Sequence, residues 1–283
     1  MTQKVALVTG ASRGIGKAVC LALAEKGFDI VASARTVKAG DVHDHMQRNR
    51  DGSALPGSLE ESAEAIRALG REVLLQRMDL LDPPSSDALV DAAIDRFGRI
   101  DVLVNNGIYQ GKGLMADFLT GDLDDIRDAF EANVIAQVHL TRLVLPHMFA
   151  RGGGVVVNMT SAAGMMDPPV TLERGGWGFG HGATKAALHR MAGMLQLEYG
   201  GRGLRAYNLE PGMVLSESFL ASMEGTDLLE LGLPSAPVEV PAAVTAWLCT
   251  DPAAVELAGQ NIHAQPFCAK RGLVPGWPPP KQA

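Results

Sequence analysis

A glycine-rich turn near the start of the chain constrains the fold more than any other feature of the sequence. Residues 9–16 lie between a short apolar run, residues 5–8, and an amphipathic helical pattern. Gly10 permits a tight turn, Gly14 lets a pyrophosphate approach the backbone, and Gly16 lets the helix pack closely on the strand. The first turn of such a helix also offers free N–H groups and a partial positive charge to phosphates. The spacing therefore predicts a strand–turn–helix unit that binds a dinucleotide.

The rest of the chain continues this alternation of strand and helix. Several expected strands are continuous apolar runs, as in parallel sheets that are covered on both faces. The pattern predicts a single α/β domain over residues 1–283: a Rossmann-type, doubly wound parallel sheet of about seven strands with helices on both faces. Strands are expected over residues 5–8, 29–33, 73–78, 102–104, 155–159, 204–208 and, more weakly, 261–264, and helices over residues 16–26, 59–69, 85–97, 123–149, 183–199 and 241–249.

The composition excludes several classes of protein. The 283 residues include 25 Lys and Arg against 32 Asp and Glu, and this net charge of −7 argues against a nucleic-acid partner. No apolar run approaches the roughly 18 residues of a membrane span, and the N-terminus has no signal-peptide core, so we expect a cytoplasmic protein. The cysteines Cys20, Cys249 and Cys268 lie far apart, which indicates reduced thiols and neither a disulfide framework nor a metal site.

Two long segments interrupt the alternation. Residues 36–58 are polar and rich in histidine, arginine, aspartate and glycine, and residues 165–180 carry a Pro-Pro pair and four glycines. Both are expected to be irregular loop insertions at the surface. Loops of this length in a compact domain are usually functional or disordered.

The glycine turn and the motifs that follow it resemble those of the short-chain dehydrogenase/reductase family. The resemblance extends along nearly the whole chain and keeps the order of the family's motifs between the corresponding strands. Where the family has Asn-Asn-Ala-Gly after its fourth strand, this chain has Gly107 and Ile108 in place of Ala-Gly. The matching positions in chain order are Asn105, Asn106, Asn133, Ser161, Lys185, Pro211 and Gly212.

The resemblance implies a nicotinamide cofactor and a set of catalytic residues. In this family a serine orients the substrate oxygen, a lysine binds the ribose, an asparagine holds a water for proton relay, and a tyrosine moves the proton. The implied catalytic residues are Asn133, Ser161, His181 and Lys185. The implied cofactor-binding residues are Gly10, Ser12, Arg13, Gly14, Ile15, Gly16, Arg35, Asp79, Leu80, Asn105, Gly107, Lys185, Pro211, Gly212, Val214 and Ser216.

Charge at the end of the second strand predicts which nicotinamide cofactor is bound. A carboxylate there would bond the ribose hydroxyls of NAD and repel a 2′-phosphate. This chain has Ala34 followed by Arg35, and Arg13 lies in the glycine turn. Because arginine makes bidentate contacts with phosphate, these residues favour NADP(H) over NAD(H).

His181 stands four residues before Lys185, where the family has its catalytic tyrosine. The three tyrosines of the chain, Tyr109, Tyr199 and Tyr207, do not fall in register with that position. Four hypotheses remain open. The imidazole carries the proton in its neutral form; Tyr109 is recruited from a neighbouring loop; the protein binds NADP but turns over poorly, as a regulator or scaffold; or the pocket performs a non-redox isomerase or lyase reaction.

The resemblance also implies a substrate class and an assembly. Residues 213–239 correspond to the family's mobile lid, and their leucines, with Trp177 and Phe179 before His181, favour a hydrophobic ketone, aldehyde or alcohol. The helices expected over residues 123–149 and 183–199 correspond to those through which family members form dimers and tetramers. An apolar stripe on the first of them, which could pack on a partner or on its own sheet, comprises Ala129, Ala132, Ala136, Leu140 and Leu143.

Overall fold

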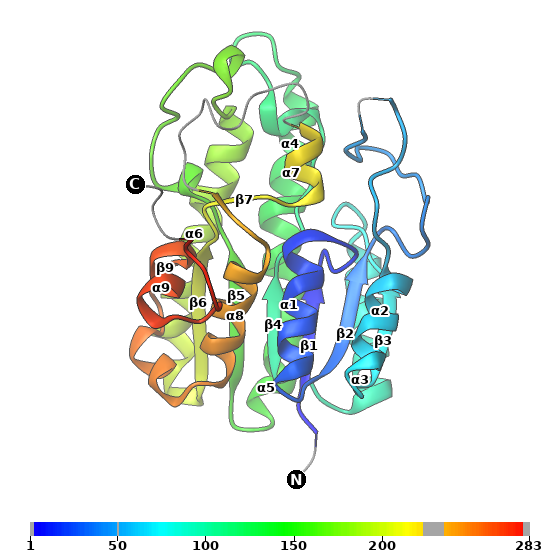
Figure 1. Ribbon diagram of the computed structural model, residues 1–283, viewed down its shortest axis with the longest axis vertical. Helices are drawn as coiled ribbons and strands as arrows, with labels where there is room; N and C mark the ends of the chain where they lie inside the picture. The colour runs from blue at the N-terminus through cyan, green and yellow to red at the C-terminus, as the bar shows by residue number, and fades with distance from the viewer. Residues whose placement is uncertain (1–2, 50, 223–234, 280–283) are drawn as a thin grey trace.

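The computed structural model describes residues 3–49, 51–222 and 235–279 of the chain. Within these ranges a seven-stranded parallel sheet runs through the molecule in the order β3-β2-β1-β4-β5-β6-β9 (Figure 1). The strand order reverses between β1 and β4, which opens a crevice at the carboxyl edge of the sheet. The strands are β1 (Val5–Thr9), β2 (Asp29–Ala34), β3 (Val73–Arg77), β4 (Val102–Asn105), β5 (Gly154–Met159), β6 (Leu204–Glu210) and β9 (Asn261–His263).

Helices cover both faces of this sheet, so the predicted doubly wound architecture is confirmed (Figure 1). Every residue of β1, β2 and β4 is buried, which explains why these strands are continuous apolar runs. One hydrophobic core lies under α1 (Gly14–Glu25), α2 (Leu59–Ala68), α8 (Glu239–Thr250) and α9 (Ala264–Arg271). A second core lies under α3 (Pro83–Phe97), α5 (Ala136–Phe149) and α6 (Phe179–Tyr199).

The helix expected over residues 123–149 is three segments, so this prediction was wrong in its continuity. A π-helical turn, Glu131–Ile135, separates α4 (Leu123–Phe130) from α5. The wide turn contains Asn133, whose side chain is engaged with the backbone of the loop after β4. Periodicity does not reveal such a turn, because it adds one residue without changing which side chains are apolar.

The helix that carries His181 begins at Phe179, four residues before the expected start at residue 183. Gly178 and Gly180 pack closely against the backbone of residues 113–116, although glycines at this spacing are typical of a loop. A Cβ atom on Gly180 would come within 2.1 Å of the carbonyl oxygen of Gly113. Since only glycine permits that approach, His181 lies in the first turn of α6 and not in the loop before it.

The apolar stripe of Ala129, Ala132, Ala136, Leu140 and Leu143 packs inside the subunit. Its first four members are buried, and Leu143 packs against the core beneath α5. This result agrees with the second interpretation of the stripe, that it faces its own sheet. The large apolar side chains that α6, the neighbouring π-helical turn and α5 expose are Ile135, Val138, Phe179, Met194 and Leu197.

A row of asparagine side chains crosses the carboxyl half of the sheet. Asn105, Asn158, Asn208 and Asn261 occupy the same register on β4, β5, β6 and β9. Each amide nitrogen donates to the oxygen of the next asparagine, at 3.0 Å, 3.0 Å and 2.7 Å along the row. The first three residues are buried, so these bonds satisfy polar groups that water does not reach.

The loops that follow the strands rise above the carboxyl edge of the sheet (Figure 1). The described residues of the loop insertion after β2, 36–49 and 51–58, form turns and irregular backbone with one isolated bridge between Arg48 and Ala54. In the expected lid, β7 (Met213–Val214), α7 (Glu217–Ser222) and β8 (Ser235–Ala236) are formed, and residues 223–234 lie outside the described residues. Among the described helices, none combines the length and apolar character needed to cross a membrane.

Candidate active site

The glycine turn after β1 has the geometry of a phosphate cradle. Gly10 and Gly14 have φ angles of 67° and 56°, in the left-handed region that favours glycine. A Cβ atom on Gly16 would lie 2.1 Å from the carbonyl oxygen of Gly10, so α1 packs on the turn only because residue 16 lacks a side chain. Helix α1 begins at Gly14, which directs the N–H groups of its first turn toward the cradle.

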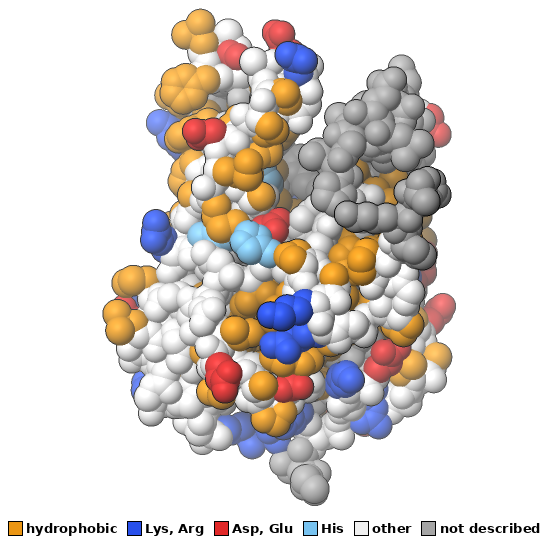
Figure 2. Space-filling view, turned by 60° about the vertical axis from the view of Figure 1, so that its left-hand side comes forward, with side chains coloured by type: hydrophobic (Ala, Val, Ile, Leu, Met, Phe, Trp, Pro, Cys, Tyr) orange, Lys and Arg blue, Asp and Glu red, His pale blue; other side chains and the backbone are white. Residues whose placement is uncertain are grey.

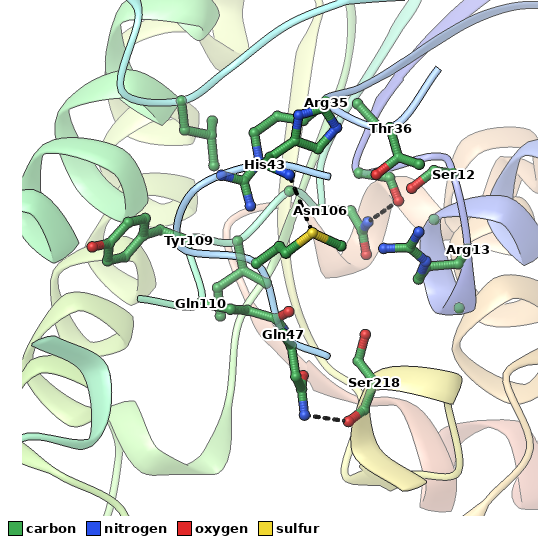
Figure 3. Close-up of a pocket in the computed structure, with 18 of the residues that line it drawn as sticks. Ser12, Arg13, Arg35, Thr36, His43, Gln47, Asn106, Tyr109, Gln110 and Ser218 are labelled. Atoms are coloured by element: carbon green, nitrogen blue, oxygen red, sulfur yellow. Dashed lines mark hydrogen bonds between the residues drawn. The ribbon is translucent and has the colours of Figure 1, made fainter. Parts of the chain in front are cut away.

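A pocket opens above this turn at the point where the strand order reverses (Figure 3). It brings together most of the expected cofactor-binding residues: Gly10, Ser12, Arg13, Gly14, Ile15, Gly16, Arg35, Asp79, Leu80, Gly107 and Ser216. The expected residues Asn105, Lys185, Pro211, Gly212 and Val214 are not in this lining. The side chain of Asn105 is buried within the sheet, where it donates to Thr141 and Asn158.

Both arginines expected to select the cofactor are bonded to the loop of residues 36–58. Arg13 donates to the carbonyl oxygens of Pro56 at 2.8 Å and Gly57 at 2.9 Å. Arg35 donates through Nη1 to the carbonyl oxygen of Asp44 at 2.8 Å. The two guanidinium groups therefore hold this loop against the pocket as well as lining it.

The same loop supplies pocket residues that sequence reasoning missed. His43, Met46 and Gln47 line the cavity, and Gln47 reaches across its mouth to donate to the carbonyl oxygen of Ser218 at 2.7 Å (Figure 3). The Nε2 atom of His43 is buried without a hydrogen-bond partner, and burial together with nearby Arg35 lowers the pKa of this imidazole. No periodicity or motif marks these residues; only their position after β2 places them near a nucleotide.

Ser161 follows β5 at the carboxyl edge of the sheet and caps the short turn Ala162–Gly164. Its Oγ atom accepts a hydrogen bond from the N–H of Ala163 at 3.2 Å. Because the hydroxyl oxygen serves as an acceptor there, its proton is free to be donated to a ligand. The arrangement suits a group that holds a substrate oxygen.

His181 and Lys185 lie one turn apart on α6 and share a face of the helix. Lys185 is buried, its Nζ atom donates to the carbonyl oxygen of Met159 at 2.8 Å, and burial lowers its pKa to about 8. Burial, reinforced by the charge of Lys185, lowers the pKa of His181 to about 4. At neutral pH the pair is therefore a neutral imidazole beside an ammonium group.

Asn133 is the other expected catalytic residue, and its environment is specific. Its Oδ1 atom accepts from the N–H of Tyr109 at 2.8 Å, whereas its Nδ2 atom is buried without a partner. A buried amide donor with no protein acceptor is well suited to hold a water. Tyr109 itself is buried, its hydroxyl lies 3.3 Å from Nδ1 of His45, and burial raises its pKa.

Comparisons with known proteins agree with this geometry. The short chain dehydrogenase family profile matches residues 4–58 and 53–225. The human protein "Dehydrogenase/reductase SDR family member 7" is 33% identical over 226 residues, which cover 80% of this chain and 59% of that protein. The matched region thus spans little more than half of this longer relative.

Two solved structures share the fold and differ in their cofactors. A 7α-hydroxysteroid dehydrogenase in complex with NADH and 7-oxo glycochenodeoxycholic acid has a TM-score of 0.72 and 26% identity, with 92% of each chain covered. The L-sorbose reductase of Gluconobacter frateurii in complex with NADPH and L-sorbose has a TM-score of 0.74 and 25% identity, with 93% of this chain and 95% of that chain covered.

Proposed function

Because the chain belongs to the short-chain dehydrogenase family, whose members are oxidoreductases, we propose that it is an NADP(H)-dependent enzyme that interconverts a hydrophobic ketone or aldehyde and the corresponding alcohol. One observation carries this proposal. Ser161, His181 and Lys185 come from the end of β5 and the first turns of α6, with His181 in its neutral form beside a charged lysine. That set holds a substrate oxygen and accepts its proton.

The residues present fit a nicotinamide cofactor. The positive φ angles of Gly10 and Gly14 and the close contact at Gly16 leave backbone room for a pyrophosphate, and Asp79 and Leu80 also line the pocket. The bound nicotinamide would accept or donate a hydride. Lys185, with its ammonium group buried at the end of β5, would bind the nicotinamide ribose.

The protonation state of His181 favours alcohol oxidation. With a pKa of about 4 the imidazole is unprotonated at neutral pH, so it is free to accept the proton of an alcohol hydroxyl, and the hydride of the carbinol carbon would go to the nicotinamide. Ser161 donates to the same oxygen, and the free Nδ2 donor of Asn133 would hold the water that passes the proton onward. Tyr109 is a poorer candidate, because its pKa is raised and its hydroxyl contacts His45.

The choice of NADP(H) rests on the absence of a carboxylate at Ala34 and on the placement of Arg13 and Arg35 in the pocket lining. A guanidinium group has five N–H donors, so the bond from Arg35 to Asp44 leaves donors for a 2′-phosphate. One solved relative is in complex with NADH and the other with NADPH, so support for NADP(H) comes from these arginines.

A hydrophobic substrate is supported by the apolar side chains around the expected lid. Leu215 and Leu220 lie in its described part, and the indole of Trp177 packs near Gly182, one residue after His181. Phe219 also lies in the described part, whereas the leucines at 228, 229, 231 and 233 lie outside the described residues. The steroid ketone bound by the hydroxysteroid dehydrogenase is a substrate of this character.

We also propose a cytoplasmic homo-oligomer, dimer or tetramer. Its interface would use Ile135, Val138, Met194 and Leu197, which leave apolar surface exposed on α6 and on the π-helical turn and α5. Hydrophobic side chains are also spread over the upper part of the face in Figure 2. The cysteines Cys20, Cys249 and Cys268 are buried and free, as expected in a reducing compartment.

The low pKa of His181 also favours a second candidate function. An imidazole that is protonated only near pH 4 is a poor acid for carbonyl reduction at neutral pH. A protein that binds NADP and turns over poorly, as a regulator or scaffold, would have the same site. A non-redox isomerase or lyase would use His181 as a base without hydride transfer.

One experiment separates these functions. Wild type and His181→Tyr are titrated with NADPH and NADH by fluorescence and screened against hydrophobic ketones and alcohols. The proposal expects tighter binding of NADPH, alcohol oxidation by the wild type, and a gain of about 10-fold or more in carbonyl reduction for His181→Tyr. Equal affinities would overturn the NADP(H) assignment, and tight binding without turnover in both proteins would favour the second candidate.

A further inference from the structure

Helix α6 forms hydrogen bonds to the backbone at the end of β5 through side chains that are spaced one helical turn apart. His181, Lys185 and His189 follow one another at four-residue intervals and share one face of the helix. Lys185 holds the carbonyl oxygen of Met159, and His189 places Nε2 at 2.9 Å from the carbonyl oxygen of Ser161. Because a carbonyl oxygen only accepts hydrogen bonds, Nε2 carries the proton in this contact.

The turn after Ser161 is pressed tightly against the same part of α6. A Cβ atom on Gly164 would lie 2.6 Å from Cδ2 of His189 and 2.6 Å from the carbonyl carbon of Lys185. Both distances are too short for a side chain at residue 164. The imidazole of His189 therefore lies directly between the helix and the turn that carries the serine.

The other ring nitrogen of His189 lies next to the last residue of the asparagine row. Its Nδ1 atom lies 3.2 Å from Oδ1 of Asn261. Asn208 donates through Nδ2 both to the backbone carbonyl oxygen of His189 at 2.6 Å and to Oδ1 of Asn261 at 2.7 Å. The backbone carbonyl of His189 fixes the orientation of the Asn208 amide, which bonds α6 to the end of β6. Because Oδ1 of Asn261 and an unprotonated Nδ1 both only accept, the contact at Nδ1 is not a hydrogen bond when the proton is on Nε2, and the ring is held through Nε2.

We propose that His189 is a positioning residue for Ser161. Its Nε2–H group fixes the carbonyl of Ser161 relative to α6, so that Oγ of Ser161 stays in reach of an oxygen that also faces His181. The inference rests on the proposed function, in which the serine hydroxyl donates to the substrate oxygen. His189 need not touch substrate or cofactor in this role.

Two substitutions of similar size distinguish the two ring contacts. In His189→Gln the amide nitrogen replaces Nε2 and keeps the bond to Ser161. In His189→Asn the shorter amide replaces Nδ1 and loses that bond. We expect His189→Asn to lower kcat for alcohol oxidation by about 10-fold, since a small misplacement of a reacting group is costly. His189→Gln should stay within about twofold of wild type, and both variants should bind NADPH as wild type does.

A structural role alone would give a different pattern. It would lower the melting temperature and kcat to the same extent in both variants, and that result would overturn the proposal. Asn261→Ala provides a further variant at an exposed position. It keeps the hydrogen bond from Nε2 of His189 to the carbonyl oxygen of Ser161, so we expect kcat to stay within about twofold of wild type.

An NMR measurement tests the contact without reference to turnover. In a long-range ¹H–¹⁵N spectrum of the wild-type protein, the Nε2 atom of His189 is expected to be protonated. An unprotonated Nε2 would overturn the positioning role whatever the activity of the enzyme. If Nε2 is protonated and the wild type oxidises no alcohol, the proposed function fails while the hydrogen bond to Ser161 stands.

Discussion

Two turns at the carboxyl edge of the sheet carry the two halves of the site, and they are built in opposite ways. The turn after β1 is made of backbone, with positive φ angles at Gly10 and Gly14 and no room for a side chain at Gly16. The turn after β5 depends on side chains: Ser161 is held from α6 and faces groups that come from that helix. Adding a side chain to the first turn would change its backbone conformation. Exchanging a side chain at the second turn would change which groups can donate or accept a proton.

The largest expected effect follows from adding a side chain to the first turn. Gly16→Val places atoms where the carbonyl oxygen of Gly10 already lies, so α1 must move away from the turn. We expect no detectable binding of NADPH by fluorescence titration and a lower melting temperature. Gly193→Ala on α6 is the matched control, because its Cβ meets only the carbonyl oxygen of Gly259 at 3.7 Å. Unimpaired NADPH binding by Gly16→Val would contradict the backbone description.

The second turn is tested by a substitution that removes a proton acceptor and keeps the volume of the side chain. His181→Phe deletes the proton acceptor and keeps an aromatic ring of similar position. We expect kcat for alcohol oxidation to fall by about 100-fold, the ordinary cost of losing a general base, while NADPH affinity changes little. A variant with wild-type turnover would show that His181 carries no proton, and the comparison between the two turns would lose its main example.

The pH dependence sharpens the role of His181. With a folded pKa of about 4, the imidazole is already neutral across pH 5–8. Its contribution to the oxidation rate is therefore constant in that range and falls about tenfold per pH unit below about 4. Single-turnover oxidation measured by rapid mixing down to pH 3.5 tests this; an inflection near pH 6.5 would mean that the imidazole titrates as it does in water.

The same pKa has a consequence for stability. Between pH 6.5 and about 4 the unfolded chain binds the proton that the folded chain excludes, so stability is lost as the pH falls through this window. Urea unfolding at pH 7 and pH 4.5 should show a smaller loss of stability in His181→Phe than in the wild type.

A smaller effect is expected from a side chain at the edge of the first turn. Arg35→Ala removes a guanidinium group from the pocket lining and its bond to Asp44. We expect NADPH to bind about 10-fold more weakly, the equivalent of one charge-assisted hydrogen bond, and NADH to bind unchanged. Equal losses for both cofactors would indicate that Arg35 acts only by holding the loop of residues 36–58.

The smallest effect concerns the contact between the two loops that border the pocket. Gln47→Ala removes the bond to the carbonyl oxygen of Ser218. We expect NADPH to dissociate about threefold faster in a stopped-flow chase, in keeping with the loss of one neutral hydrogen bond. Asn49→Ala in the same loop serves as the control, because among the described residues its side chain bonds to Ser53 and Ala54 of that loop.

The first turn could be predicted from the sequence because glycine spacing has a direct meaning in backbone geometry. Gly10, Gly14 and Gly16 predicted the cradle, and the apolar runs predicted the order of strands and helices. The start of α6 was missed because Gly180 was assigned to the glycine-rich loop of residues 165–180. Its actual role, a close approach to Gly113, depends on a residue far away in the sequence.

The second turn could be predicted only in part. The family resemblance indicated Ser161, His181 and Lys185, and the structure places His181 and Lys185 on one face of α6. It did not indicate His189, whose contacts come from β6, β9 and the end of β5. Nor did it indicate that His43 and Gln47 line the pocket, because a polar loop has no periodicity from which its packing can be inferred.

The asparagine row has a consequence for how the chain tolerates substitution over evolution. Its amides point the same way, from Asn105 through Asn158 and Asn208 to Asn261, so each of the two middle residues donates to one neighbour and accepts from the other. Exchange of Asn158 for leucine leaves a donor of Asn105 and the acceptor of Asn208 without their partner in the row. Exchange for aspartate adds a charge and removes the donor to Oδ1 of Asn208, because a carboxylate only accepts. Substitutions in the row should therefore accumulate as compensated pairs or sets, and lineages that keep one member should keep its neighbours.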